Sequence, residues 1–176
     1  MKKLVAFAGS NSSDSINKLL VNYAASLVQD AQTTVLDLND FELPIYGKDL
    51  EAKNGIPKSA IDFYNHIKES DGIILSLAEN NGAYTVAFKN LFDWMSRHDA
   101  KLFLKKPMLL MATSSGGRGG IGVLEMAESR FPYHDGNVVA TFSLPLFLEK
   151  YKDGKITDPQ FDDKLKEAVN EFQKQL

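Results

Sequence analysis

The chain has 176 residues, of which 44% are hydrophobic and 24% charged, and its formal net charge is −3. These values are typical of one globular domain spanning residues 1–176, and they exclude disordered, collagen-like and disulfide-scaffold proteins. The absence of cysteine excludes thiolate catalysis, iron–sulfur clusters and cysteine-bound zinc, so redox chemistry would need an organic cofactor. The mild acidity argues against a nucleic-acid partner, which would favour a basic face.

The N-terminal residues 4–8 form an apolar stretch after two lysines. This stretch is shorter than the roughly 7–15 apolar residues of a secretion signal, and no run approaches the roughly 20 residues of a membrane span. We therefore expect a cytoplasmic protein that does not contact a membrane. The histidines at 66, 98 and 134 are widely spaced and predict no metal site.

Strands and helices are predicted to alternate along the chain. In chain order, the patterns predict strand 3–8, helix 15–29, strand 33–38, helix 57–70, strand 72–77, helix 83–96, strand 107–112, helix 121–130, strand 137–142 and helix 159–173. Residues 39–56 lose periodicity and predict a long surface connection, a feature that is more often functional than a short one.

This alternation predicts an α/β fold with a parallel sheet covered on both faces. The nearly continuous apolar strands agree, because such strands are buried on both sides. Five strands with helical crossovers fit a flavodoxin-like three-layer sandwich of strand order 2-1-3-4-5. Ligands of such folds bind beyond the carboxyl ends of the strands, so the turns after Ala8, Leu77 and Ala112 are the candidate site.

The first of these turns leads from a strand directly into a helix and is rich in hydroxyl groups. It reads Gly9-Ser10-Asn11-Ser12-Ser13-Asp14-Ser15-Ile16-Asn17. Free N–H groups at a helix start bind anions, and the hydroxyls add donors, so the turn predicts a phosphate monoester site. An ordinary helix cap is the alternative, but a cap needs only one such residue. The Asp14 carboxylate would repel phosphate unless it points away.

The chain contains neither G-x-G-x-x-G after its first strand nor a P-loop, which disfavours a dinucleotide-binding dehydrogenase and a P-loop NTPase. The second turn, at 78–82, reads Ala-Glu-Asn-Asn-Gly. The third, at 113–120, reads Thr-Ser-Ser-Gly-Gly-Arg-Gly-Gly. Its glycines would let the backbone approach a flat ligand closely.

Together the three turns resemble those of the NADPH-dependent FMN reductase family, which has the flavodoxin-like fold. Its first motif, approximately G-S-x-R-x-x-S-x-N, resembles residues 9–17. Its second, approximately P-E-Y-N with a following helix L-K-N-x-x-D-W, resembles residues 78–81 and 88–94. Its third is a serine-glycine loop, matched at 114–120. This chain departs from the family at Ser12, which replaces arginine, at Ala78, which replaces proline, and at Asn80, which replaces tyrosine. These departures imply a more polar, more open site and put the FMN affinity in question.

The resemblance implies a role for each turn. The FMN phosphate would be held by Ser10, Ser12, Ser15, Ile16 and Asn17. The ribityl chain and ring would run along Ala78, Glu79, Asn80, Asn81 and Gly82. The other ring edge would be bordered by Ser114, Ser115, Gly116, Gly117 and Arg118. No catalytic side chain is expected, because the flavin itself takes the hydride.

Three further residue roles follow from the same motifs. Arg118 either meets the extra phosphate of NADPH or is simply solvated, and Glu79 would bond either a substrate or the ribityl hydroxyls. Lys89, Asn90, Asp93 and Trp94 would stabilise the helix and a subunit contact.

The resemblance implies an FMN-dependent oxidoreductase that moves two electrons from NADPH or NADH to a small acceptor. Candidate acceptors are a quinone, a flavin, an azo compound or a metal oxyanion. We expect a homodimer or homotetramer. A flavodoxin-type electron carrier and a flavin-free α/β binding domain are the alternatives.

Overall fold

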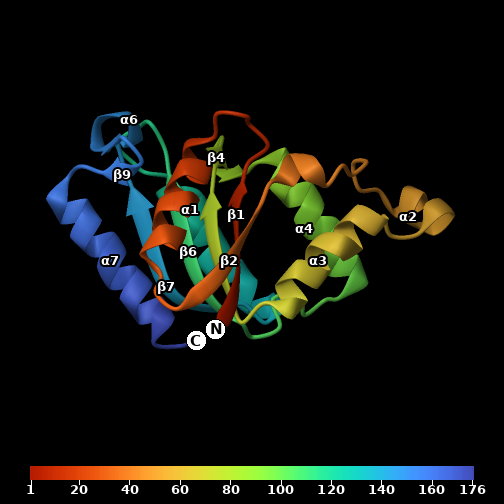
Figure 1. The fold of residues 1–176 in the computed structure, drawn as a ribbon. Coiled ribbons are helices and arrows are strands. Elements are labelled where there is room, and N and C mark those ends of the chain that lie inside the picture. The colour runs from red at the N-terminus through yellow and green to blue at the C-terminus, as the bar shows by residue number, and fades with distance from the viewer.

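The computed structural model describes all 176 residues and contains the predicted parallel sheet. Its strands are β1 (Lys2–Gly9), β2 (Ala31–Leu36), β3 (Gly72–Leu77), β6 (Pro107–Thr113) and β7 (Asn137–Leu144). They lie in the order β2-β1-β3-β6-β7, and each neighbouring pair is parallel (Figure 1). Counted among these five strands, this is the predicted order 2-1-3-4-5, which is confirmed.

Helices cover both faces of the sheet and complete the three layers (Figure 1). One face carries α1 (Ile16–Leu27) and α7 (Pro159–Gln173), and the other carries α3 (Lys58–Glu69), α4 (Val86–His98) and α5 (Ile121–Arg130). Every residue of the central strand β3 is buried, as expected for a strand packed on both sides. All strands therefore end at one edge, and the three candidate turns follow three adjacent strands there.

The second candidate turn folds differently from its prediction. Instead of starting the helix, Ala83–Tyr84 forms a short strand, β5, paired with β4 (Glu79–Asn80). Helix α4 begins only at Val86, because the Thr85 hydroxyl caps it by accepting a hydrogen bond from the Phe88 N–H at 3.1 Å. The same hydroxyl donates to the Gly9 carbonyl at 2.9 Å, which ties α4 to the end of β1.

Other predicted boundaries also shift. Strand β2 lies two residues earlier than the predicted 33–38, and α1 ends before the predicted 29. The prediction of irregular structure over 39–56 is partly wrong, because a 3-10 turn (Leu38–Asp40) and α2 (Lys48–Asn54) form there. Helix α2 buries no residue and projects from the sheet, so it has no apolar stripe for a sequence pattern to show (Figure 1).

The segment after β7 contains elements that were not predicted, namely α6 (Phe147–Lys150), β8 (Tyr151–Lys152) and β9 (Lys155–Ile156). The last two pair as an antiparallel hairpin. No helix in the structure has both the length and the apolar character needed to cross a bilayer.

The long connection is fastened to α4 by two residues of the predicted helix motif. The Asn90 amide donates to the Pro44 carbonyl at 3.0 Å and accepts from the Tyr46 N–H at 2.8 Å. The Trp94 indole N–H donates to the same Pro44 carbonyl at 2.7 Å. Trp94 is completely buried, so the expectation that it makes a subunit contact is wrong: its role is to hold this connection within the chain.

Tyr84 packs its ring into an aromatic cluster beneath the β4–β5 hairpin. It lies 5.3 Å from the Phe88 ring and is stacked 6.4 Å from the Phe131 ring. Its hydroxyl is buried and has no hydrogen-bond partner, and burial raises the pKa of Tyr84 to about 12. An unpaired buried hydroxyl costs stability, because it loses its hydrogen bonds to water on folding.

We predict that Tyr84→Phe raises the free energy of unfolding by about 1 kcal/mol, because it removes an unsatisfied polar group and keeps the ring. Tyr64→Phe is the matched control, since the Tyr64 hydroxyl donates to the Asp99 carboxylate at 2.7 Å. That variant should lose about 1–2 kcal/mol. Urea unfolding of both variants measures the difference, and equal losses of stability would contradict the prediction.

Candidate functional site

The three predicted turns meet at the carboxyl edge of the sheet and enclose a cavity of about 300 Å³. Its wall consists of Ser10, Asn11, Ser12, Asp14, Ser15, Ile16, Asn17, Ala78, Glu79, Asn80, Thr85, Thr113, Ser114 and Ser115. Most of the predicted site residues thus come together. The exceptions are Asn81, Gly82, Gly116, Gly117 and Arg118, which are exposed and lie outside this wall.

Four wall residues were missed by the sequence analysis as site residues. Asn11 and Asp14 belong to the first turn, but the family motif assigns them no role. Thr113 is the last residue of β6, and Thr85 directly precedes α4. A threonine directly before an apolar helical pattern is a capping signal, and that signal could have identified Thr85.

Helix α1 presents free donors to this cavity. Ser15 is its N-cap and accepts from the Lys18 N–H at 3.3 Å. The N–H groups of residues 13–17 donate no hydrogen bond within the chain. Free N–H groups and the positive end of the helix dipole favour an anion at this position.

The charges around this helix start are unusual for an anion site. No lysine, arginine or histidine lines the cavity, and Asp14 is part of its wall. Lys18, on the first turn of α1, is paired with Asp37, and this hydrogen bond lowers the pKa of the Asp37 carboxyl. A bound anion would therefore depend on backbone N–H groups and hydroxyls.

The side chain of Asn17 is used inside the protein. Its Oδ1 accepts from the Ser76 hydroxyl at 2.7 Å and from the Thr113 N–H at 3.1 Å, and its Nδ2 donates to the Thr113 carbonyl at 3.2 Å. The residue is only 2% exposed. The Asn17 side chain thus holds α1 against the ends of β3 and β6. The backbone N–H of Asn17 donates no hydrogen bond within the chain.

The Glu79 carboxylate also has an internal partner. Its Oε2 accepts from the Val123 N–H, in the first turn of α5, at 2.8 Å. The N-cap of α5 is Gly120, which has no side chain to do this. A Cβ atom on Gly122 would lie 2.9 Å from the same carboxylate oxygen. Glu79 therefore holds the β4–β5 hairpin against α5 and satisfies a donor of that helix.

The third loop has a fixed base and an open tip. The Ser143 hydroxyl donates to the Gly119 carbonyl at 3.0 Å, and the Leu146 N–H donates to the Gly116 carbonyl at 3.0 Å. Gly119 has φ +60°, and a Cβ there would lie 2.4 Å from the Ser143 hydroxyl, so only glycine fits. At the tip, no atom lies within 4 Å of a Cβ built on Gly117.

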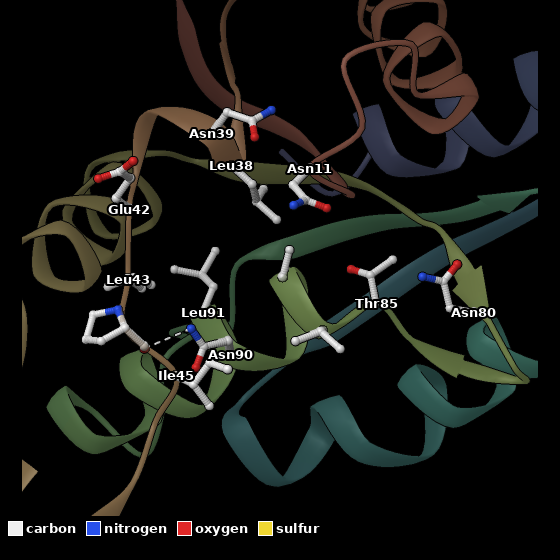
Figure 2. A pocket seen from close by; sticks show the side chains of 13 residues that line it. Asn11, Leu38, Asn39, Glu42, Leu43, Ile45, Asn80, Thr85, Asn90 and Leu91 are labelled. Atoms are coloured by element: carbon white, nitrogen blue, oxygen red, sulfur yellow. Dashed lines mark hydrogen bonds between the residues drawn. The ribbon is translucent and has the colours of Figure 1, made fainter. Parts of the chain in front are cut away.

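A second, larger cavity of about 730 Å³ shares part of its wall with the first. Figure 2 shows the residues that line it. Its wall combines the connection before α2 with the start of α4, and it consists of Asn11, Leu38, Asn39, Glu42, Leu43, Pro44, Ile45, Asn80, Thr85, Val86, Ala87, Asn90 and Leu91. Asn11, Asn80 and Thr85 line both cavities. The position where the family motif has tyrosine, Asn80, is thus part of the border between them.

Known proteins resemble this chain over parts of its sequence. A quinone reductase of Escherichia coli is 29% identical over 79 residues, 45% of this chain and 42% of that protein. An NADPH azoreductase of Bacillus sp. is 30% identical over 127 residues, 69% of this chain and 64% of that protein. The aligned segments thus span less than two thirds of either relative.

Among solved structures, FerB, a flavoenzyme NAD(P)H:(acceptor) oxidoreductase from Paracoccus denitrificans, superposes with a TM-score of 0.78. The two sequences are 25% identical, and the superposition covers 99% of this chain and 96% of that one. The family model described as NADPH-dependent FMN reductase matches residues 2–149. This match extends from β1 into α6 and includes all three loops of the cavity, and the chain belongs to the NADPH-dependent FMN reductase family.

Proposed function

We propose that the protein is an FMN-dependent oxidoreductase that passes two electrons from NADPH or NADH to a small acceptor. The observation that carries this proposal is the pair of adjoining cavities at the carboxyl edge of the sheet, the smaller of which contains the free helix start of α1. The names of the relatives, a quinone reductase and an azoreductase, support the same reaction class.

The residues of the smaller cavity fit the phosphate end of FMN. The Ser10, Ser12 and Ser15 hydroxyls and the N–H groups of Ile16 and Asn17 would hold the phosphate. Backbone can replace the arginine that the family motif has at Ser12, because five consecutive N–H groups are free there. Asn17 would act as a positioning residue through its three internal hydrogen bonds.

The other two loops would border the flavin ring. Ala78 and Asn80 lie in the cavity wall, and at the exposed Gly117 no atom lies within 4 Å of a Cβ position, so the tip of the third loop is open to a ring. Bound FMN supplies the hydride chemistry, so the chain needs no acid or base at the reacting atoms. Glu79 would keep the hairpin and α5 at a constant separation while the ring is held between the loops.

The larger cavity favours an enzyme over an electron carrier. A carrier that docks on proteins needs an exposed flavin edge, whereas a reductase needs room for a second small molecule next to the flavin. A volume of about 730 Å³ beside the smaller cavity provides that room. A homodimer or homotetramer and a cytoplasmic location remain predictions.

The first prediction concerns the cofactor itself. The protein incubated with FMN and then desalted should retain flavin absorbance at about one equivalent per chain. NADPH or NADH should bleach this absorbance, and a quinone should restore it. A colourless protein, or a bound flavin that neither nicotinamide bleaches, would contradict the proposed function.

The second prediction tests the phosphate site by its charge. Asp14→Asn should tighten FMN binding about fivefold, because removing a carboxylate near the phosphate relieves a repulsion of about 1 kcal/mol. Riboflavin, which lacks the phosphate, is the matched control ligand and should bind both proteins equally. Flavin fluorescence titrations measure both affinities. Equal effects on FMN and riboflavin would place the phosphate elsewhere.

The third prediction concerns the nicotinamide donor. Arg118 is the only cation in the three loops, it is exposed, and it forms no ion pair within the chain. We propose that it meets the extra phosphate of NADPH. Arg118→Ala should then lower the ratio of kcat/KM for NADPH to that for NADH about tenfold, the loss expected for a hydrogen bond to a charged group. An unchanged ratio would show that Arg118 is merely solvated.

A further inference from the structure

The larger cavity has a wall that is held in place. Its outer side is the segment around Pro44, whose carbonyl accepts from Asn90 at 3.0 Å and from Trp94 at 2.7 Å. The Phe41 ring packs edge-on against Phe63, 4.9 Å between centroids, and anchors the segment on its other side. The cavity is therefore formed in the free protein.

The only charge on the wall of this cavity is negative. Aliphatic side chains such as Leu43, Ile45 and Val86 line the cavity beside the polar ones. Glu42 is its only charged residue, and no lysine, arginine or histidine lines it. The Glu42 carboxylate has no hydrogen bond or ion pair within the chain, so no neighbouring group neutralises it. Figure 2 shows Glu42 beside Leu43 and Asn39 at the end of the cavity away from Asn80.

Polar recognition is available at the other end of the cavity, where it meets the smaller one. Asn11 and Asn80 line both cavities, and their side-chain amides form no hydrogen bond within the chain. By contrast, the Asn90 amide is occupied by Pro44 and Tyr46. Two free amides in a wall that also has aliphatic side chains suit a ring compound with carbonyl groups, since each amide can donate to one oxygen.

We infer that the larger cavity binds the electron acceptor, and that Glu42 makes it select uncharged or cationic ring compounds against anionic ones. This inference rests on the proposed function and narrows its acceptor classes, favouring quinones over metal oxyanions and sulfonated dyes. Glu42 acts as a specificity-determining residue, because an anion that enters this wall meets a carboxylate and no compensating cation.

The test uses two probes with the same rings and different charge, 1,4-naphthoquinone and 1,4-naphthoquinone-2-sulfonate. Trp94 is the only tryptophan, and its indole N–H donates a hydrogen bond to the carbonyl of Pro44, which lines the cavity. Quenching of its fluorescence therefore reports binding even to flavin-free protein. Free N-acetyltryptophanamide, titrated in parallel, corrects for absorption by the quinones. Binding is thus measured separately from turnover.

The wild-type protein should bind the neutral quinone more tightly than its sulfonate. In Glu42→Gln the ratio of the two dissociation constants should shrink about three- to tenfold, the range expected for removing one like charge from the wall of the cavity that holds the sulfonate. High salt should shrink the ratio in the wild type and leave it constant in the variant. Asp40→Asn is the matched control, because Asp40 is exposed two residues away and does not line the cavity. It should leave the ratio unchanged.

The inference is overturned if neither quinone quenches Trp94, if both bind the wild type equally, or if Asp40→Asn changes the ratio as much as Glu42→Gln does. A protein that binds the quinones as expected but never retains FMN would instead refute the proposed function and leave the charge selectivity standing. Turnover of the FMN-loaded protein with NADH should show the same change in the ratio of kcat/KM values for the two quinones.

Discussion

The side chain of Asn17 bonds to both Ser76 and Thr113, and the arrangement of the three loops depends on this connection. Parallel strands end with backbone groups that have no further strand to pair with, and a buried group of this kind must find another partner. An asparagine amide offers both a donor and an acceptor, so one side chain can satisfy the end of β6 while holding α1 in place. Thr85 does the same between α4 and β1.

The hydrogen bonds of Asn17, Thr85 and Glu79 occupy these side chains at the edge of the sheet. The polar groups that such bonds do not occupy are the ones available to a ligand. Helix α4 is capped by Thr85, and α5 receives the Glu79 carboxylate. In α1 the Ser15 side chain likewise accepts from the Lys18 N–H, and the N–H groups of residues 13–17 donate no hydrogen bond within the chain. The run of unused N–H groups at residues 13–17 is what the start of α1 offers to an anion.

Two of the three departures from the family motif change the polarity of the site. Ser12 replaces arginine, and Lys18 is paired with Asp37, so no cationic side chain lines the smaller cavity. An anion there would be bound by backbone N–H groups and hydroxyls. With Asn80 in place of tyrosine, the border between the two cavities is polar and lacks an aromatic ring. The larger cavity nevertheless keeps a fixed wall, because Asn90 and Trp94 bond its outer segment to α4.

The layers, the strand order and the three loops could be predicted from the sequence alone, because buried parallel strands and amphipathic helices leave a strong local pattern. The sequence also led to most of the residues around the smaller cavity, since these follow the strands directly. Other features follow from contacts that the sequence pattern does not show. Helix α2 has no buried face and therefore no apolar periodicity in its sequence. Trp94 donates a hydrogen bond to Pro44, 50 positions away in the chain. The larger cavity is lined by both Glu42 and Asn80, which come from different segments. Such contacts join residues that are distant in the chain, and local periodicity contains no information about them.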